Sequence, residues 1–182
     1  MWSSNVTHIK RLIGPICALS VLAACTVEPL NGTSSSRISN DGTSQSVRTI
    51  MKSTSVAPVS TRVGQQVRNN LLFELNGGQL VEGGEYRVTL NVTSASRSLA
   101  IERDSLTPTS SQAVVSVTYR LVKSDSGDVI SEGTRRAVAS YDQTPQKFAN
   151  ERALRDAQNR AAKEVALYLR LAIGQALTKA QG

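Results

Sequence analysis

The stretch Tyr86-Arg87-Val88-Thr89-Leu90-Asn91-Val92-Thr93 alternates apolar and polar side chains without a break. Because successive side chains of a β-strand point to opposite faces of a sheet, this period of two predicts a strand with one buried face and one polar face. A second alternation covers residues 113–121. The turn-forming run at residues 124–128 separates it from a third strand over residues 129–141. We therefore expect an antiparallel meander of three strands.

Two amphipathic helices are expected on either side of this meander. The first covers residues 61–75, and Asn76-Gly77-Gly78 ends it. Its apolar stripe consists of residues four apart: Val63, Val67, Leu71 and Leu75. The second begins at Thr144-Pro145, with the threonine hydroxyl as N-cap, and runs to about Leu177. Its stripe is rich in alanine, which allows a close approach to a sheet: Leu154, Ala157, Ala161, Val165, Tyr168, Ala172 and Ala176.

The order of elements defines the fold class. A weak alternation over residues 47–56, ended by Pro58, predicts one further short strand before the first helix. The order is then β-α-β-β-β-α. A four-stranded, mostly antiparallel sheet with two helices packed on one face satisfies it, which is an α+β fold.

The second face of this sheet is expected to be uncovered and polar. It would carry Arg87, Thr89, Asn91, Thr93, Ser116, Thr118 and Arg120. Such a face suits water, a polar protein surface or the polar lumen of a transmembrane barrel. Between the first two strands, residues 94–111 are mostly polar and contain Arg97 and Arg103. We expect this segment to extend the hairpin beyond the core, where its tip is a good place for a binding contact.

The beginning of the chain has the layout of a secretory signal peptide. Lys10 and Arg11 precede a mostly apolar run, residues 12–23, that is too short to span a bilayer. Leu22-Ala23-Ala24-Cys25 resembles the bacterial lipobox, which implies cleavage before Cys25 and acylation of that residue. Acyl chains on Cys25 would anchor the protein to a membrane that it does not cross. Thr26 follows the cysteine where an aspartate commonly retains such proteins in the inner membrane, so the resemblance implies the periplasmic face of the outer membrane.

Three regions follow from this interpretation. Residues 1–24 are the signal peptide, residues 25–46 are the lipidated N-terminus with a flexible linker, and residues 47–182 are a single α+β domain. The linker is expected because the chain from Asn31 to Ser46 is almost entirely small and polar.

Composition disfavours catalysis and metal binding. The only histidine, His8, and one of the two cysteines, Cys17, would leave with the signal peptide, and Cys25 would carry lipid. The mature chain would then lack the commonest general base, the commonest transition-metal ligand and any disulfide. The acidic residues form no close pair in an apolar setting, so we expect no enzyme, no metal site and no cofactor.

The charge of the mature chain allows an anionic partner. Cleavage before Cys25 would remove two of the 21 basic residues and none of the 14 acidic ones, which leaves a net charge of +5. Lipid phosphates or an acidic protein surface would suit that charge, which could equally serve solubility alone. Nucleic acid is disfavoured, because aromatic residues make up only 4% of the chain and do not interleave with basic ones.

The chain resembles the LptE family of lipopolysaccharide-assembly lipoproteins. The resemblance depends on the lipobox, on Pro29-Leu30-Asn31-Gly32, on the order of strands and helices, and on the stretches at residues 86–90, 117–121 and 137–162. It covers essentially the whole mature chain. Thr26-Val27 replaces the usual glycine and aromatic residue after the cysteine, and Asn31 replaces a common aromatic, which puts the local packing near the anchor in doubt.

The resemblance implies a plug inside the outer-membrane barrel protein LptD, which assists assembly of the barrel and contacts lipopolysaccharide during export. Arginines would pair with lipopolysaccharide phosphates. Placement alone, and no shared motif, suggests Arg87, Arg97, Arg103 and Arg120 for this role. Two alternatives remain: a lipoprotein that pilots or activates another envelope complex, such as a secretin or a peptidoglycan synthase, and a free-standing lipid shuttle.

Overall fold

A computed structural model describes residues 36–38, 44–101 and 108–180. These residues all belong to one compact unit, Ser36–Gly182. The predictions for the signal peptide, for Cys25 and for Arg103 lie outside the described residues.

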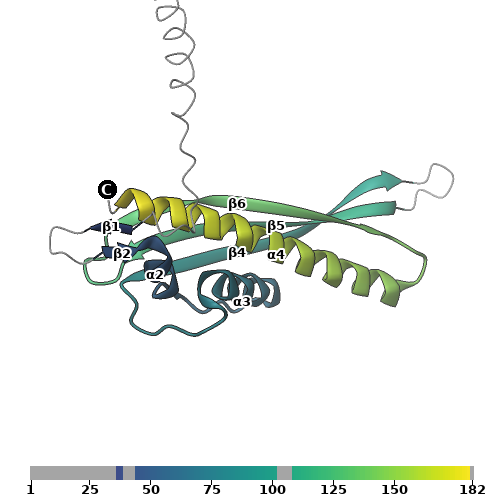
Figure 1. The fold of residues 1–182 in the computed structure, drawn as a ribbon. Coiled ribbons are helices and arrows are strands. Elements are labelled where there is room, and N and C mark those ends of the chain that lie inside the picture. Colours follow the sequence, from purple (N-terminus) through teal and green to yellow (C-terminus); the bar gives the residue numbers. More distant parts are fainter. Residues whose placement is uncertain (1–35, 39–43, 102–107, 181–182) are drawn as a thin grey trace, which may run out of the picture. The chain divides into compact units, whose positions relative to one another are not determined.

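The helices and strands of the described chain follow one another in the expected order, with additional elements near its beginning (Figure 1). In sequence they are β1 (Ser36–Ile38), β2 (Ser44–Ser46), α2 (Val47–Lys52), β3 (Ser55–Val56), α3 (Arg62–Asn76), β4 (Tyr86–Ile101), β5 (Pro108–Lys123), β6 (Val129–Asp142) and α4 (Lys147–Ala180). β1 and β2 pair as a separate antiparallel two-stranded sheet, so the predicted linker contains paired strands. The main sheet has the order β3-β4-β5-β6. Only β3 pairs with its neighbour in parallel, which confirms the predicted α+β fold with a mostly antiparallel sheet.

The register of the meander explains why one face of the sheet is buried. Val88 lies opposite Leu121, and both side chains are fully buried under the helices. Thr89 lies opposite Arg120, and both are exposed on the other face. The same alternation continues into β6, where Ala137 and Ala139 are buried. A shift of one residue would exchange the two faces, so the alternation fixes the register.

The helices cover a single face of this sheet. In Figure 1, α4 runs along β5 and β6, and α3 lies beside it nearer to β4. Small residues of α4, including Ala157, Ala161 and Ala162, are fully buried in the core. No helix in the described part of the chain is both long and apolar enough to cross a membrane.

The prediction for residues 47–56 was wrong over most of its length. Residues 47–52 form the helix α2, and only Ser55 and Val56 are a strand. The buried residues of α2 are Val47, Ile50 and Met51, and the last two follow Val47 by three and four positions rather than by two. That spacing places them on one side of a helical turn, against the core.

The ends of the other helices are set by local hydrogen bonds. Thr61 caps α3, with its Oγ1 accepting a bond of 3.1 Å from the amide of Gly64, and Gly77 ends the helix in the left-handed conformation. The second predicted helix begins two residues later than expected, at Lys147 rather than Pro145, and Thr144 before it is held by Asn150. The amide of Thr144 donates to Asn150 Oδ1 over 2.7 Å, and Asn150 Nδ2 donates to the carbonyl of Thr144 over 2.6 Å.

One residue of the predicted α4 stripe does not lie in the core. The side chain of Tyr168 is 37% exposed, and its hydroxyl donates a hydrogen bond to Glu164 one turn earlier. The remaining stripe residues are buried or half-buried, so the predicted direction of the helix is correct.

The β4–β5 hairpin continues past the core, as predicted. β4 runs to Ile101 and β5 begins at Pro108, and residues 93–99 of β4 are exposed. Proline is suited to the first position of a strand because it has no amide hydrogen to contribute to the ladder.

Candidate binding surfaces

The uncovered face of the main sheet is polar along β4, β5 and β6, which confirms the prediction for this surface. Thr118 and Thr134 hydrogen-bond through their hydroxyls over 3.2 Å across β5 and β6. Arg120 Nε lies 4.0 Å from Glu132 Oε2, in a pair whose side chains are both well exposed. An exposed pair at this distance contributes little stability, so its charges remain available to a partner. We call this surface the open face. Its polar members include Arg87, Thr89, Asn91, Thr93, Ser116, Thr118, Arg120, Glu132, Thr134 and Arg136.

The predicted arginine sites do not form one cluster. Arg120 lies opposite Thr89, and Arg87 is two residues along from Thr89, so Arg87 and Arg120 are diagonal neighbours on the open face. Arg97 lies opposite Gln112, ten residues further along β4. At about 3.3 Å per residue this separation is about 33 Å. A single phosphate group could not contact Arg87 and Arg97 together.

The structure adds Arg136 to the open face, where it lies opposite Ser116. The third strand was predicted from the sequence, without an assignment of its residues to the two faces. In β6 the buried residues Ala137 and Ala139 alternate with exposed ones, and this alternation assigns Arg136 to the open face.

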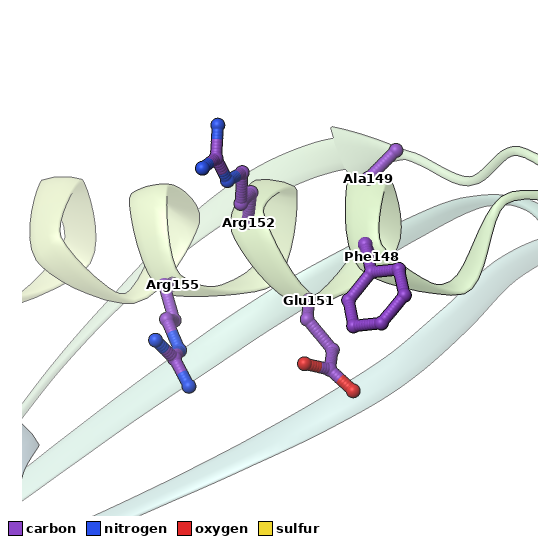
Figure 2. Close-up of a pocket in the computed structure, with 5 residues that line it drawn as sticks. All are labelled: Phe148, Ala149, Glu151, Arg152 and Arg155. Atoms are coloured by element: carbon purple, nitrogen blue, oxygen red, sulfur yellow. The ribbon is translucent and has the colours of Figure 1, made fainter.

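A second surface lies at the beginning of α4. Figure 2 shows a pocket there lined by Phe148, Ala149, Glu151, Arg152 and Arg155. The Phe148 side chain is 82% exposed, an unusual position for a large aromatic group. Arg152 and Arg155 have no ion pair within the described part of the chain. In Figure 2 the Phe148 ring, the Glu151 carboxylate and the Arg155 guanidinium lie on one side of α4, and Arg152 points to the other side. An exposed aromatic ring near a guanidinium can contact a ligand that is both apolar and anionic.

This surface exists because α4 extends beyond the helix that packs beside it. Arg62, the first residue of α3, donates from Nη1 to Asn159 Oδ1 over 3.1 Å. Arg155 and Phe148 precede Asn159 by one and by three helical turns, so they share a side of α4 with it. α3 begins at Arg62 and does not accompany that side further. From sequence alone, Arg152 and Arg155 fit an ordinary solvated helical face, and no pattern singles out Phe148.

The two surfaces provide groups for binding rather than groups for reaction. Within residues 36–38, 44–101 and 108–180, no three His, Cys, Asp or Glu residues gather in a way that could hold a metal ion. The prediction that the protein is not an enzyme stays a prediction. Hydroxyls, amides and guanidiniums on these surfaces can hydrogen-bond to polar protein groups and to phosphates.

Comparison with solved structures identifies the architecture as one found in bacterial lipoproteins. A candidate lipoprotein from Caulobacter crescentus superposes with a TM-score of 0.58 at 22% identity, over 72% of this chain and 95% of that one. Rare lipoprotein B from Shewanella oneidensis superposes with a TM-score of 0.55 at 10% identity, over 71% of this chain and 97% of that one. At these identities the likeness concerns the fold alone. No protein with a curated description matches the sequence.

The sequence profile of the LptE family, described as lipopolysaccharide-assembly, matches residues 50–169. That match spans more than half of the chain and includes both helices that cover the sheet, except for the last residues of α4. The protein therefore belongs to the LptE family of lipopolysaccharide-assembly proteins.

Proposed function

We propose that this protein is a lipoprotein anchored through Cys25 at the periplasmic face of the outer membrane. There it plugs an LptD-like β-barrel, assists its assembly and contacts lipopolysaccharide during export. The observation that carries the proposal is the open face, a broad polar surface on a sheet whose other face packs against the helices along the core.

The open face fits the interior of a transmembrane barrel. The lumen of such a barrel is polar, because its strands alternate between lipid-facing apolar residues and lumen-facing polar ones. Threonine, asparagine and arginine side chains on the open face can exchange water for hydrogen bonds to such a wall. The open face has few exposed apolar groups, one of which is Val138, 41% exposed. An apolar partner would therefore bury little apolar surface there.

Contact with lipopolysaccharide is assigned to the end of the domain that holds the hairpin tip. β6 ends beside the first residues of β5, since Asp142 pairs with Ser110, and α4 begins soon afterwards. Arg97 and the surface around Arg152 and Arg155 thus belong to the same end. Guanidiniums there would pair with phosphates while Phe148 contacts the acyl region. Arg103 is a further candidate from the sequence.

The protein acts by binding in this proposal, without a catalytic group, metal ion or cofactor. The family match supports a role in assembly and transport.

Co-purification tests the plug. The full-length protein, extracted in detergent, should bring with it an outer-membrane barrel that mass spectrometry identifies as LptD-like. Thr118→Trp places a bulky side chain at an exposed position of the open face and should reduce the yield of the barrel several-fold. Gln65→Trp makes the same addition on the exposed side of α3 and serves as the matched control.

The partner identifies the class of function. Recovery of a secretin or a peptidoglycan synthase in place of the barrel would overturn the plug and establish the alternative of a pilot or activator. Equal barrel yields from the two tryptophan variants would show that the open face is not the contact.

A further inference from the structure

A pocket of about 420 Å³ lies where β3, α3 and the loop before β4 meet. The described residues that line it include two arginines, Arg68 from α3 and Arg87 from β4, and one carboxylate, Glu82. Its apolar wall includes Val56, Ala57, Pro58, Leu80 and Val81. Neither the family match nor the proposed plug accounts for this combination of groups.

The first arginine is held in place by backbone groups. Arg68 Nε donates to the carbonyls of Val56 and Ala57 over 3.2 and 3.1 Å, and Nη2 donates to the carbonyl of Val56 over 3.1 Å. Nη1 makes no hydrogen bond to another described residue. The half-buried guanidinium is therefore preorganised, so a ligand that used Nη1 would not have to immobilise the side chain.

The same bonds argue against an added peptide strand as the occupant. β3 is an edge strand, and an extended peptide would pair with its free backbone groups. Arg68 already occupies the carbonyls of Val56 and Ala57. The ligand must instead be recognised through the side chains that line the pocket.

The charge in the pocket favours an anion. Arg87 is exposed and has no ion pair in the portion of the chain that the structure describes, and the same holds for Glu82. Two guanidiniums against one carboxylate leave an excess of positive charge. A phosphate group offers several acceptor oxygens and can bond to both guanidiniums at once.

The apolar wall indicates what this phosphate is attached to. Leu80 is 71% exposed and lies in the same lining as the arginines. An exposed leucine beside cationic groups is the pattern by which proteins hold the headgroup and the adjoining apolar part of a lipid. We propose that this pocket binds the phosphate of an anionic membrane lipid, with Leu80 and Val81 against the lipid's apolar portion.

This lipid site is separate from the lipopolysaccharide contact proposed for the hairpin end. Arg87 is at the beginning of β4, and Arg97 is about 33 Å further along that strand. The site does not depend on the presence of a barrel. Lipid bound at this site would attach the domain to the membrane, in addition to any N-terminal anchor.

The test uses the full-length protein in neutral detergent. Dihexanoyl phosphatidic acid, a short-chain soluble lipid, is titrated while the arginine Nε–Hε resonances are followed by NMR. We expect saturable shifts for Arg68 and Arg87, and weaker binding of inorganic phosphate and of dihexanoyl phosphatidylcholine. Arg87→Gln should weaken the affinity by roughly tenfold, the effect of losing one charge-assisted hydrogen bond. Glu82→Gln should strengthen it.

The control variant is Arg48→Gln, which removes the same charge from an exposed position on α2. It should leave the affinity unchanged. If Arg48→Gln and Arg87→Gln lose equal affinity for the lipid, the lipid is attracted unspecifically to a basic protein. That result would overturn the site. If inorganic phosphate binds as tightly as dihexanoyl phosphatidic acid, the occupant is a phosphate and not a lipid. If the resonances of Arg68 and Arg87 do not shift, the pocket binds neither.

Discussion

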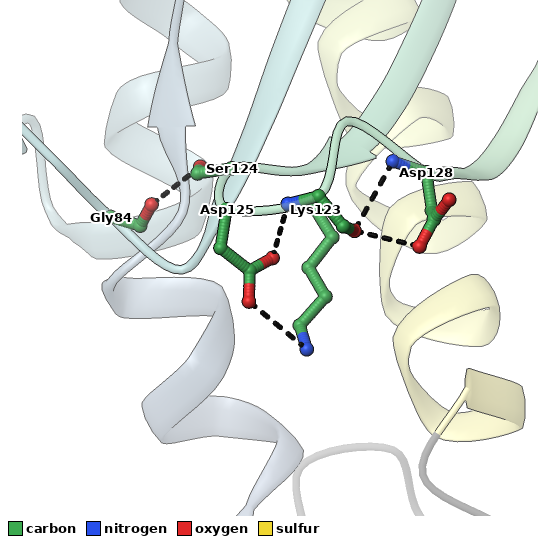
Figure 3. A network of polar contacts seen from close by, with 6 residues as sticks. Gly84, Lys123, Ser124, Asp125 and Asp128 are labelled. Carbon is green, nitrogen blue, oxygen red and sulfur yellow. Dashed lines mark hydrogen bonds and ion pairs between the residues drawn. The ribbon is translucent and has the colours of Figure 1, made fainter.

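Gly84 lies against the backbone of Ser53 so closely that a Cβ at Gly84 would stand 1.8 Å from the carbonyl oxygen of Ser53. On its other side, Ser124 Oγ donates to the carbonyl of Gly84 over 2.6 Å, as Figure 3 shows. Ser124 also donates its amide to the carbonyl of Glu85 over 2.8 Å. The corner after α2, the loop before β4 and the turn after β5 are therefore joined at one glycine.

Replacing this glycine tests whether the junction is required. Gly84→Ala forces two backbone segments apart, so we expect a loss of about 3 kcal/mol in the free energy of unfolding, the upper range for overpacking. Gly133→Ala is the matched control, because its Cβ would stand 3.5 Å from the Tyr119 ring in ordinary contact. Urea denaturation followed by circular dichroism measures both. Similar midpoints for the two variants would contradict the close approach.

The core should be most sensitive where α4 meets the sheet and α3. Leu169 is fully buried, whereas Leu171 on the same helix is 47% exposed. Leu169→Ala is expected to cost about 2–5 kcal/mol, through lost burial and the cavity left behind. The same truncation at Leu171 should cost a small fraction of that amount. Thermal unfolding of both variants checks the difference, and equal costs would place α4 in another orientation.

Ionisation of Tyr86 is expected to destabilise the fold at alkaline pH. Burial, and next the charge of Glu85, raise the pKa of the Tyr86 hydroxyl above its ordinary value of 10.0. The folded state then keeps a proton that the unfolded state loses, so stability is complete below pH 10 and falls as the pH rises through the raised pKa. The ultraviolet absorbance of tyrosinate, compared with that of Tyr86→Phe, measures this ionisation. Glu85→Gln should lower the pKa only part of the way, because burial contributes more.

The meander could be predicted from sequence because its information is local. The alternation at residues 86–93 and 113–121 specifies strands, and in a sheet covered on one side it also specifies the open face. α2 was missed because Val47, Ile50 and Met51 form only one helical turn, in which periods of two and of 3.6 are hard to distinguish. The start of α4 was misplaced because Asn150, six residues later, binds Thr144 in place of a simple cap.

The candidate sites were less accessible to sequence reasoning. Phe148 becomes notable only because α3 begins at Arg62 and does not extend alongside it. The pocket of Arg68 and Arg87 gathers residues that are nineteen positions apart in the chain. Such proximity depends on tertiary packing, and no short motif records it. Arg87 and Arg120 could be placed on the open face from sequence, because the alternation of a strand assigns each residue to one face.

The anchor is tested at Cys25. Cys25→Ala removes the thiol to which a diacylglycerol would be attached, so metabolic labelling with palmitate should be lost and the protein should leave the membrane fraction. Cys25→Ser gives the same loss of the thiol with a smaller change in polarity and serves as a second variant. Unchanged labelling in both would contradict the assignment of this residue.

The proposed contact with lipopolysaccharide at the hairpin end is tested through the guanidinium charges near Phe148. Arg152→Gln combined with Arg155→Gln should weaken binding of purified lipopolysaccharide by roughly tenfold or more at low salt, since each charge-assisted contact to a phosphate is worth about 1.5–3 kcal/mol. The difference from the unaltered protein should shrink as salt screens the phosphates. Arg48→Gln, which removes the same charge from an exposed position of α2 outside both proposed lipid sites, is the control and should leave binding unchanged. If Arg48→Gln weakens binding as much as the double variant does, lipopolysaccharide is attracted to the basic protein unspecifically and the assignment to the hairpin end is wrong.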